Sequence, residues 1–164
     1  MPKVRTYSDS DRESLIPLIA AFRVELGKLR GRDRKADLTG ARKELDEYIQ
    51  LSYPIFVAEC DDMTIAGYHV CRVDGQVVWG ESLFVLPQYR RQGIAGMLYD
   101  AAENLAKNNG QETVYNWVHP NNDKIIGFLK ARGYNVLNLI ELRRPLKGEK
   151  LDTVVKVNNH KYRY

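Results

Sequence analysis

The sequence predicts one α/β domain of the α+β type, with a mixed, mostly antiparallel sheet of about six or seven strands and about four helices. Three observations carry this prediction. The elements follow the order β-α-α-β-β-β-α-β-α-β, with a possible last strand. A tight hairpin signal lies in the middle of the chain. No repeat or linker divides the 164 residues. The domain is therefore expected to cover residues 1–164, with a basic extension from about residue 145.

The composition is that of an ordinary globular protein, with 44% apolar and 28% charged residues. No run approaches the roughly 18 apolar residues that a membrane span needs, and the first residues carry no apolar signal core, so we expect a cytoplasmic protein. Cys60 and Cys71 fall in neighbouring predicted strands and are expected to be buried thiols rather than a disulfide. Residues 143–164 hold seven basic and two acidic side chains. This tail is either solvated surface or contacts an anionic partner.

In the first half of the chain, apolar residues at helical spacing place two helices, and runs rich in β-branched and aromatic residues place the strands. The expected elements are a strand within Val4–Tyr7, helices over residues 9–29 and 38–51, and strands over Ile55–Cys60, Thr64–Val73 and Val77–Val85. Pro17 indicates a kink or a late start in the first helix. Asp74-Gly75 marks the hairpin between the last two strands.

The second half alternates helices and strands. Gly110 and Gly133 serve as helix stops. The expected elements are helices over Ile94–Asn108 and Asp123–Arg132, and strands over Glu112–Val118, Tyr134–Leu142 and, more weakly, Thr153–Val157.

The segment Tyr89 to Leu98, Y-R-R-Q-G-I-A-G-M-L, joins an apolar strand to an amphipathic helix. The free N–H groups of a first helical turn point outward, and the helix dipole favours negative charge there. Gly93 and Gly96 let an oxyanion approach the backbone, and the arginines before them add positive charge. The segment therefore predicts a phosphate or pyrophosphate cradle.

The element order and two motifs resemble the GNAT (Gcn5-related N-acetyltransferase) superfamily, over Val4 to about Arg143. The signature Q/R-x-x-G-x-G/A is met by Arg90, Gly93 and Ala95, after Val85-x-Pro87-x-Tyr89. The second motif, an asparagine about eleven residues before a G-F or G-Y pair, is met by Asn122 and Gly133-Tyr134.

The resemblance implies the GNAT fold and acetyl-CoA as co-substrate. It implies that main-chain groups near Phe84 and Val85 pair with the pantetheine arm, where their strand splays from Glu112–Val118. It implies that Asn122 bonds the cofactor arm from the other side. A helix cap is the alternative for Asn122, compatible with that role. The residues that it implies for the pyrophosphate are Arg90, Arg91, Gln92, Gly93, Ala95 and Gly96.

For catalysis, the resemblance implies that Glu81 is the general base and that the Val85 N–H stabilises the oxyanion. Strand alternation places Glu81 on the face of Leu83 and Val85, opposite Ser82 and Phe84. The alternative for Glu81 is a strand-edge salt bridge.

Leu129 occupies the place of the family's tyrosine general acid and cannot give a proton. Tyr134, Tyr115 and His119 are nearby in the sequence. Of these, Tyr134 is expected in the core and His119 in a polar loop.

The resemblance implies that the segment between the first two helices, here the basic loop Lys28–Leu38, helps to cover the acceptor. As a lid it suits an acceptor with a carboxylate or phosphate and disfavours polyamines, whereas the alternative is a solvated loop. Glu25, Tyr48 and Tyr53 are further candidates for the acceptor pocket. In this family the tail commonly packs or exchanges at a dimer interface, so a homodimer is expected.

The function that this predicts is acetyl transfer from acetyl-CoA to a primary amine of a small molecule or peptide, by direct attack. One alternative is an acyl-CoA-binding module with weak or no catalysis, because of Leu129. Another is a nucleic-acid-associated protein acting through the basic tail, which no interleaving of aromatic and basic residues supports. No metal site is expected.

Overall fold

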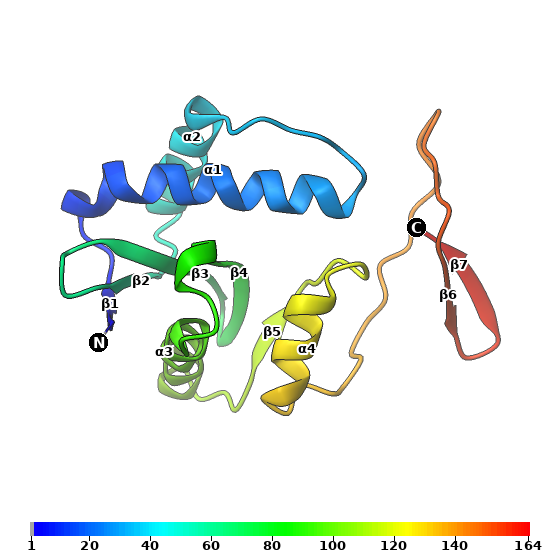
Figure 1. Cartoon of the computed structure of the whole chain (residues 1–164). Helices are drawn as coiled ribbons and strands as arrows, with labels where there is room; N and C mark the ends of the chain where they lie inside the picture. The colour runs from blue at the N-terminus through cyan, green and yellow to red at the C-terminus, as the bar shows by residue number, and fades with distance from the viewer. Residues whose placement is uncertain (1) are drawn as a thin grey trace. The chain divides into compact units, whose positions relative to one another are not determined.

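The computed structural model of the chain describes residues 2–164. Its helices, strands and 3₁₀ turns (η) are shown in Figure 1. They are β1 (Lys3–Thr6), η1 (Asp9–Asp11), α1 (Arg12–Leu29), α2 (Leu38–Gln50), β2 (Ile55–Glu59), β3 (Ile65–Asp74), β4 (Val77–Val85), η2 (Pro87–Tyr89), α3 (Ile94–Asn108), β5 (Val114–Asn116), α4 (Asp123–Ala131), β6 (Val154–Val157) and β7 (His160–Arg163).

The chain divides into two compact units, one up to Ile126 and one from Gly127 to Tyr164. The first unit contains a five-stranded sheet in the order β1-β2-β3-β4-β5. Its neighbours are antiparallel except for β4 and β5, which run parallel. Figure 1 shows α1 and α2 over one face of this sheet and α3 over the other. The mixed, mostly antiparallel α/β sheet is therefore confirmed.

Two apolar clusters fill the space on either side of the sheet. The cluster beneath α1 and α2 includes Leu15, Ile19, Leu45, Tyr68 and Phe84. The cluster beneath α3 contains Ala58, Ala66, Val85, Ile94 and Leu98. Burying a leucine or isoleucine side chain completely stabilises a fold by about 1.5–3 kcal/mol. These two clusters hold β3 and β4, and with them the connection from β4 to α3.

An ionic network fixes the start of the chain. The Arg5 guanidinium donates to both carboxylate oxygens of Asp11, at 2.7 and 2.8 Å, and to Glu59 at 3.0 Å. The Ser8 N–H also donates to Asp11, at 2.8 Å. These bonds, those from Arg5 first, hold the pKa of the Asp11 carboxyl below its usual value. Arg5 thereby joins β1 and β2 to the turn that starts α1.

The predicted strand over Tyr134–Leu142 is wrong, because those residues adopt no strand. Apolar side chains there are exposed, Val136 by 83% and Leu139 by 78%. A strand forms only against a neighbouring hydrogen-bonding edge. Within residues 127–164, β6 and β7 pair with each other and with nothing else. The weak strand expected at Thr153–Val157 does form, as β6, and its partner β7 was not foreseen.

The described residues bear on two other expectations. Cys60 and Cys71 are both free thiols, as predicted, with Cys71 buried and Cys60 half-buried. Within residues 2–164, no helix combines the length and the hydropathy that a bilayer span requires.

Candidate functional site

The connection from β4 to α3 is a row of backbone N–H groups. After η2, Arg91 takes φ 62° and Gly93 takes φ 82°, both left-handed, before α3 begins at Ile94. Among residues 2–164, no acceptor lies on the backbone N–H groups of residues 91–96. Six consecutive free donors at a helix start form a site for an anion. This row, residues 91–96, is called the cradle below; it contains the predicted donors Arg91, Gln92, Gly93, Ala95 and Gly96, whose binding of a pyrophosphate stays a prediction.

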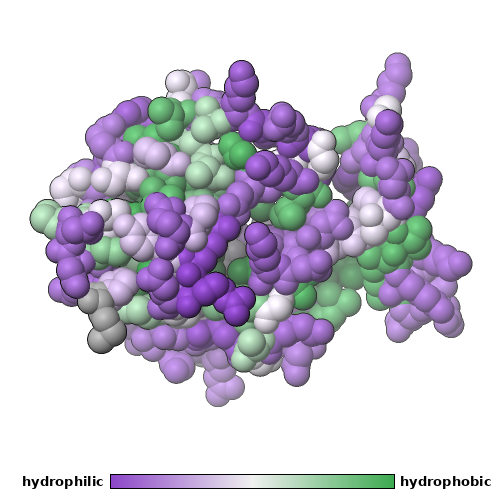
Figure 2. Space-filling view, viewed as in Figure 1, coloured by the Kyte–Doolittle hydropathy of each residue, from purple (hydrophilic) through white to green (hydrophobic). Residues whose placement is uncertain are grey.

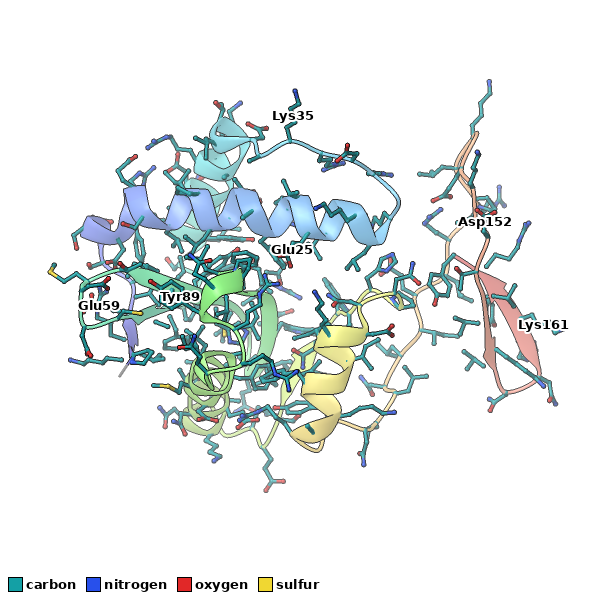
Figure 3. The ribbon with its side chains drawn as sticks, viewed as in Figure 1. Glu25, Lys35, Glu59, Tyr89, Asp152 and Lys161 are labelled. Atoms are coloured by element: carbon teal, nitrogen blue, oxygen red, sulfur yellow. The ribbon has the colours of Figure 1, made fainter. Side chains whose placement is uncertain are left out.

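Arg90 points elsewhere. Its Nε donates to the Val85 carbonyl at 2.7 Å, and its Nη2 donates to Glu25 Oε1 at 2.7 Å. Its guanidinium also lies over the Phe84 ring, 5.3 Å from the centroid. In Figure 3, Glu25 is labelled on the side of α1 that faces the connection from β4 to α3, and Tyr89 is labelled on that connection. Arg90 thus fastens the cradle to β4 and α1, and Glu25 is its partner.

The end of β4 has a free edge. Pairing between β4 and β5 stops at Gly80 and Asn116. On the other side, the Leu86 N–H donates to Ala66 at 2.9 Å, and the register continues back to Val85↔Gly67 and Phe84↔Tyr68. Because ladder bonds alternate along an antiparallel pair, Phe84 bonds β3, whereas the main-chain groups of Val85 point away from β3. Val85 therefore presents its N–H along the unpaired edge.

Glu81 sits in a β-bulge. Ser82 pairs with Val70 and Gly80 pairs with Cys71, so Glu81 is the extra residue of β4. A bulge brings two successive residues opposite one residue of the partner strand and interrupts the alternation of faces. Glu81 consequently lines a cavity with Tyr48, on the α2 side, whereas Leu83 and Val85 pack toward α3. The predicted face of Glu81 is wrong for this reason.

Arg72 on β3 is the ion-pair partner of Glu81, with 3.5 Å between Nε and Oε2. The Arg72 guanidinium lies 5.3 Å from the ring centroids of both Trp79 and Trp117. Cation–π contacts of this kind restrict the guanidinium. Sequence reasoning missed Arg72, although Arg72 and Trp79 stand opposite each other across the predicted hairpin. Burial first, and then the Glu81 carboxylate, raise the pKa of the adjacent Cys71 thiol to about 12.

A cavity of about 380 Å³ opens beside Glu81. Tyr48 and Tyr53, both predicted for the acceptor side, line it with their rings stacked 5.8 Å apart. The Tyr48 hydroxyl donates to Glu44 at 2.5 Å. The pKa of Tyr48 is raised mainly by burial and next by this hydrogen bond to Glu44. The residues lining the cavity are Arg23, Gly40, Lys43, Glu44, Glu47, Tyr48, Leu51, Tyr53 and Glu81. Three carboxylates against two cations give this cavity an acidic balance that suits an ammonium group.

The predicted basic loop borders a second, smaller cavity. Its volume is about 110 Å³, and Arg30, Arg32 and Arg34 of the loop line it together with Arg23 and His119. No carboxylate is among its lining residues. The two cavities therefore share Arg23 and carry opposite charge.

The model of the acetyltransferase (GNAT) family matches residues 25–134, which include the cradle, the bulge and Asn122. The chain belongs to this family. The co-substrate of GNAT enzymes is acetyl-CoA, which carries the pyrophosphate that the cradle was predicted to hold. No curated protein sequence matches the chain significantly.

Solved structures share the GNAT fold at low sequence identity. Aminoglycoside acetyltransferase AAC(6')-Iy, in complex with the bisubstrate analogue CoA-S-monomethyl-acetylneamine, is 20% identical, with a TM-score of 0.67 over 89% of this chain and 99% of that one. Aminoglycoside antibiotic 6'-N-acetyltransferase AAC(6')-Ih from Acinetobacter baumannii is 21% identical, with a TM-score of 0.65 over 90% and 100%. A GNAT-family acetyltransferase from Staphylococcus aureus is 18% identical, with a TM-score of 0.64 over 99% and 98%.

The second GNAT motif lies on α4. The Asn122 carbonyl accepts the Ile126 N–H at 3.0 Å and its side chain accepts the Ile125 N–H at 3.4 Å, so Asn122 caps the helix. Its additional role toward the cofactor arm stays a prediction. Leu129, in the place of the family's tyrosine, is buried.

The other candidates for a general acid have different surroundings. Tyr115 stacks against Trp79 with 5.2 Å between the ring centroids. The Nδ1 atom of His119 accepts the Asn121 N–H at 3.2 Å. Burial, and then the charge of Arg30, lower the pKa of His119. Tyr134 is half-buried, and its N–H donates to the Leu129 carbonyl at 3.0 Å.

Proposed function

We propose that this GNAT protein is an acetyl-CoA-dependent N-acetyltransferase that acts on a primary amine of a small molecule or peptide. The observation that carries the proposal is the row of free N–H donors at residues 91–96, directly after a strand whose edge is unpaired beyond Gly80. The donors suit a pyrophosphate and the free edge suits an extended amide chain. Acetyl-CoA has both groups.

In the proposed reaction, Val85 and Glu81 act at the acetyl carbonyl and at the amine. The Val85 N–H donates to the oxyanion that forms when the amine nitrogen attacks the carbonyl. Glu81, in the acidic cavity, removes the ammonium proton directly or through a water. The attacking nitrogen then gives its extra proton to water, the carbon–sulfur bond breaks, and the thiolate leaves without a proton from position 129, because leucine has none to give.

The amine class of the acceptor has support from the related structures. Two of the proteins with this fold are aminoglycoside N-acetyltransferases. The acidic balance and the tyrosine rings of the cavity beside Glu81 fit an ammonium group as well. The acceptor is therefore proposed as an amine, without carrying over the aminoglycoside itself.

The proposal is tested by a thiol-release screen with acetyl-CoA against amines, amino acids, polyamines, aminoglycosides and N-terminal peptides. Calorimetry with acetyl-CoA accompanies the screen. Binding together with release that depends on an amine supports the enzyme. Absence of acetyl-CoA binding overturns the proposal at its base.

A second candidate function is an acyl-CoA-binding module with weak or no catalysis. Two observations favour it, the buried leucine at position 129 and the ion pair that occupies the Glu81 carboxylate. In that case acetyl-CoA binds, no amine accelerates thiol release, and Glu81→Gln changes neither property.

We also propose that residues 1–164 form one GNAT domain whose C-terminal part meets a second copy of the chain. In this part, six large apolar side chains of residues 136–146 are exposed. Figure 2 shows hydrophobic patches among the hydrophilic surface of the molecule. Contiguous exposed apolar side chains of this number are typical of interfaces. Light scattering should give the mass of a dimer, and Leu139→Lys with Leu142→Lys should give that of a monomer. A monomeric wild-type protein at micromolar concentration would contradict the dimer.

A further inference from the structure

The loop after α1 is held in a defined conformation. Gly31, at φ 64°, donates its N–H to the Lys28 carbonyl at 3.0 Å, and the Arg32 N–H donates to the Gly27 carbonyl at 2.9 Å. This is a Schellman motif, which ends a helix and directs the chain that follows. Gly27 then receives the stem of Arg34, because a Cβ at Gly27 would lie 3.2 Å from Arg34 Cδ. Arg30, Arg32 and Arg34 are exposed, as the solvated-loop alternative expects, but the turn at Gly31 brings all three to the lining of one cavity.

Three of the arginines around the smaller cavity have no acidic partner. Within residues 2–164, no carboxylate lies within ion-pair distance of Arg30, Arg32 or Arg34. Of the loop's two aspartates, Asp37 caps α2, accepting the Gly40 N–H at 2.9 Å, and Asp33 stands between Arg32 and Arg34 in the sequence but does not line the cavity. The charge of this cluster also acts on His119, whose pKa is lowered by burial and by Arg30. The cluster is thus a concentrated positive site without a counter-ion of its own.

Compensation of the helix dipole does not explain the cluster. Cations near a helix C-terminus are stabilised within its last turn. Arg30 meets that condition, but Arg34 lies beyond the end of α1 and reaches back over Gly27. Arg32 and Arg34 are exposed to solvent, and a ligand with negative charge bound in the cavity that they line would compensate both charges at once.

The positive cluster lies at a fixed offset from the acidic cavity. Arg23 lines both cavities and is itself paired with Glu44 at 2.7 Å. From Arg23 to Arg30 the helix α1 advances about 10 Å, at 1.5 Å per residue. A molecule that spans this offset can present an ammonium at one end and an anion at the other.

We propose that Arg30, Arg32 and Arg34 bind a carboxylate or phosphate of the acceptor whose amine lies beside Glu81 in the Tyr48–Tyr53 cavity. This inference rests on the proposed acetyl transfer and names the substrate class for it. The acceptors are amines with an anionic group about 10 Å from the nitrogen, such as longer ω-amino acids or phosphorylated amines. The arginine cluster disfavours polycations, so aminoglycosides and polyamines are poor acceptors.

The test compares amines that differ only in the anion. Glycine, β-alanine, γ-aminobutyrate and ε-aminocaproate are each assayed against their primary amides, and 6-aminohexyl phosphate against 6-aminohexanol. Kanamycin and spermidine serve as polycations. We expect kcat/KM to favour the acid over its amide, with the preference rising with chain length toward ε-aminocaproate. The phosphate and carboxylate arms show which anion the cluster prefers.

Two double variants distinguish the effect of the arginine cluster from the effect of the loop's overall positive charge. In Arg32→Ala with Arg34→Ala, we expect KM for ε-aminocaproate to rise about tenfold or more, with kcat within about twofold and with the amide unaffected. Lys28→Ala with Lys35→Ala removes the same charge from the same loop outside the cavity. Figure 3 shows Lys35 pointing outward, and this variant should match the wild type. Thermal melting confirms that both variants are folded.

The outcomes distinguish failure of the proposed substrate class from failure of the proposed acetyltransferase activity. Equal turnover of acids and amides, or better turnover of kanamycin, overturns the substrate class while the acetyltransferase stands. If no amine is acetylated, the proposed function fails, and the cluster is judged by calorimetry with ε-aminocaproate. Binding that Arg32→Ala with Arg34→Ala removes supports the anion site, and absence of binding to the wild type overturns it.

Discussion

The Glu81 carboxylate and the Arg72 guanidinium lie 3.5 Å apart on adjacent strands, at the bulge of β4. The bulge turns Glu81 toward the acidic cavity, and the two tryptophan rings beside Arg72 fix the direction of its charge. The ion pair of Glu81 is therefore compatible with its proposed role as the base. Arg72 orients the carboxylate that we propose to take the proton.

Replacing Glu81 with glutamine should lower kcat about 100-fold or more, because general-base assistance contributes about 10²–10⁴ to the rate. Affinity for acetyl-CoA should be unchanged. Steady-state kinetics and calorimetry measure the two quantities. Asp74→Asn is the matched control, since Asp74 lies 3.8 Å from the same arginine but at the hairpin. If Glu81→Gln turns over at the wild-type rate, Glu81 is not the base.

Arg72→Met keeps an unbranched side chain between Trp79 and Trp117 but removes the charge. We expect kcat to fall about tenfold with unchanged acetyl-CoA affinity, and the protein to lose about 1 kcal/mol from the cation–π contacts. Kinetics and denaturant unfolding give both values. Arg42→Met, which breaks an exposed pair with Glu13, should change neither by a comparable amount. A wild-type kcat in Arg72→Met would show that Arg72 has no role in turnover.

Gly93→Ala should weaken acetyl-CoA binding about tenfold. Alanine at φ 82° costs about 1–2 kcal/mol, which the loop can relieve by turning the free N–H groups out of register. The control is Gly75→Ala, at φ 60° in the β3–β4 hairpin, where the added Cβ likewise meets nothing within 4 Å. Both variants should lose similar stability, measured by melting. Only the first should bind acetyl-CoA more weakly, and equal affinity of the two would argue against the cradle.

Acid should destabilise the protein through His69. Its ring is buried against Tyr99, its Nδ1–H donates to the Leu98 carbonyl at 3.3 Å, and burial lowers its pKa from 6.5 to about 4. Between pH 6.5 and pH 4, His69 is therefore protonated in the unfolded chain and neutral in the folded one. The free energy of unfolding decreases as the pH is lowered through that window. The titration of His69 alone should lower the free energy of unfolding by about 2 kcal/mol when the pH is lowered from 7 to 5.

Denaturant unfolding at pH 5 and pH 7 measures this difference, and His69→Gln should remove most of it. Asp11 does not interfere, because its carboxyl pKa is lowered and its contribution is lost only below its ordinary value of 3.8. A wild-type protein equally stable at pH 5 and pH 7 would show that His69 is protonated without cost.

The free N–H groups of the cradle could be predicted from the sequence because the signals for them are local. Gly93 and Gly96 stand at a strand-to-helix junction, and free donors at a helix start follow from backbone geometry alone. The direction of Glu81 was not predictable in this way. Whether a strand carries an extra residue depends on its register with a partner, here Cys71 and Val70 of β3, and alternation along β4 contains no sign of it.

Long-range contacts explain the other differences. Arg90 belongs to the predicted anion motif, yet its partners Glu25 and the Val85 carbonyl are chosen by how α1 crosses the sheet. The apolar pattern of Tyr134–Leu142 predicts a strand, but pairing requires an edge that a propensity cannot supply. The arginines after α1 were recognised as basic, whereas their convergence on one cavity follows from the Schellman motif at Gly31.

The most direct test of the cradle is a calorimetric comparison of acetyl-CoA with S-acetylpantetheine, which lacks the pyrophosphate and the nucleotide. If the N–H groups of residues 91–96 hold the pyrophosphate, acetyl-CoA binds one-to-one, and S-acetylpantetheine binds about 100-fold more weakly or not at all. Addition of inorganic pyrophosphate should compete with acetyl-CoA. Equal affinity for the two thioesters, or no binding of acetyl-CoA, would contradict the account.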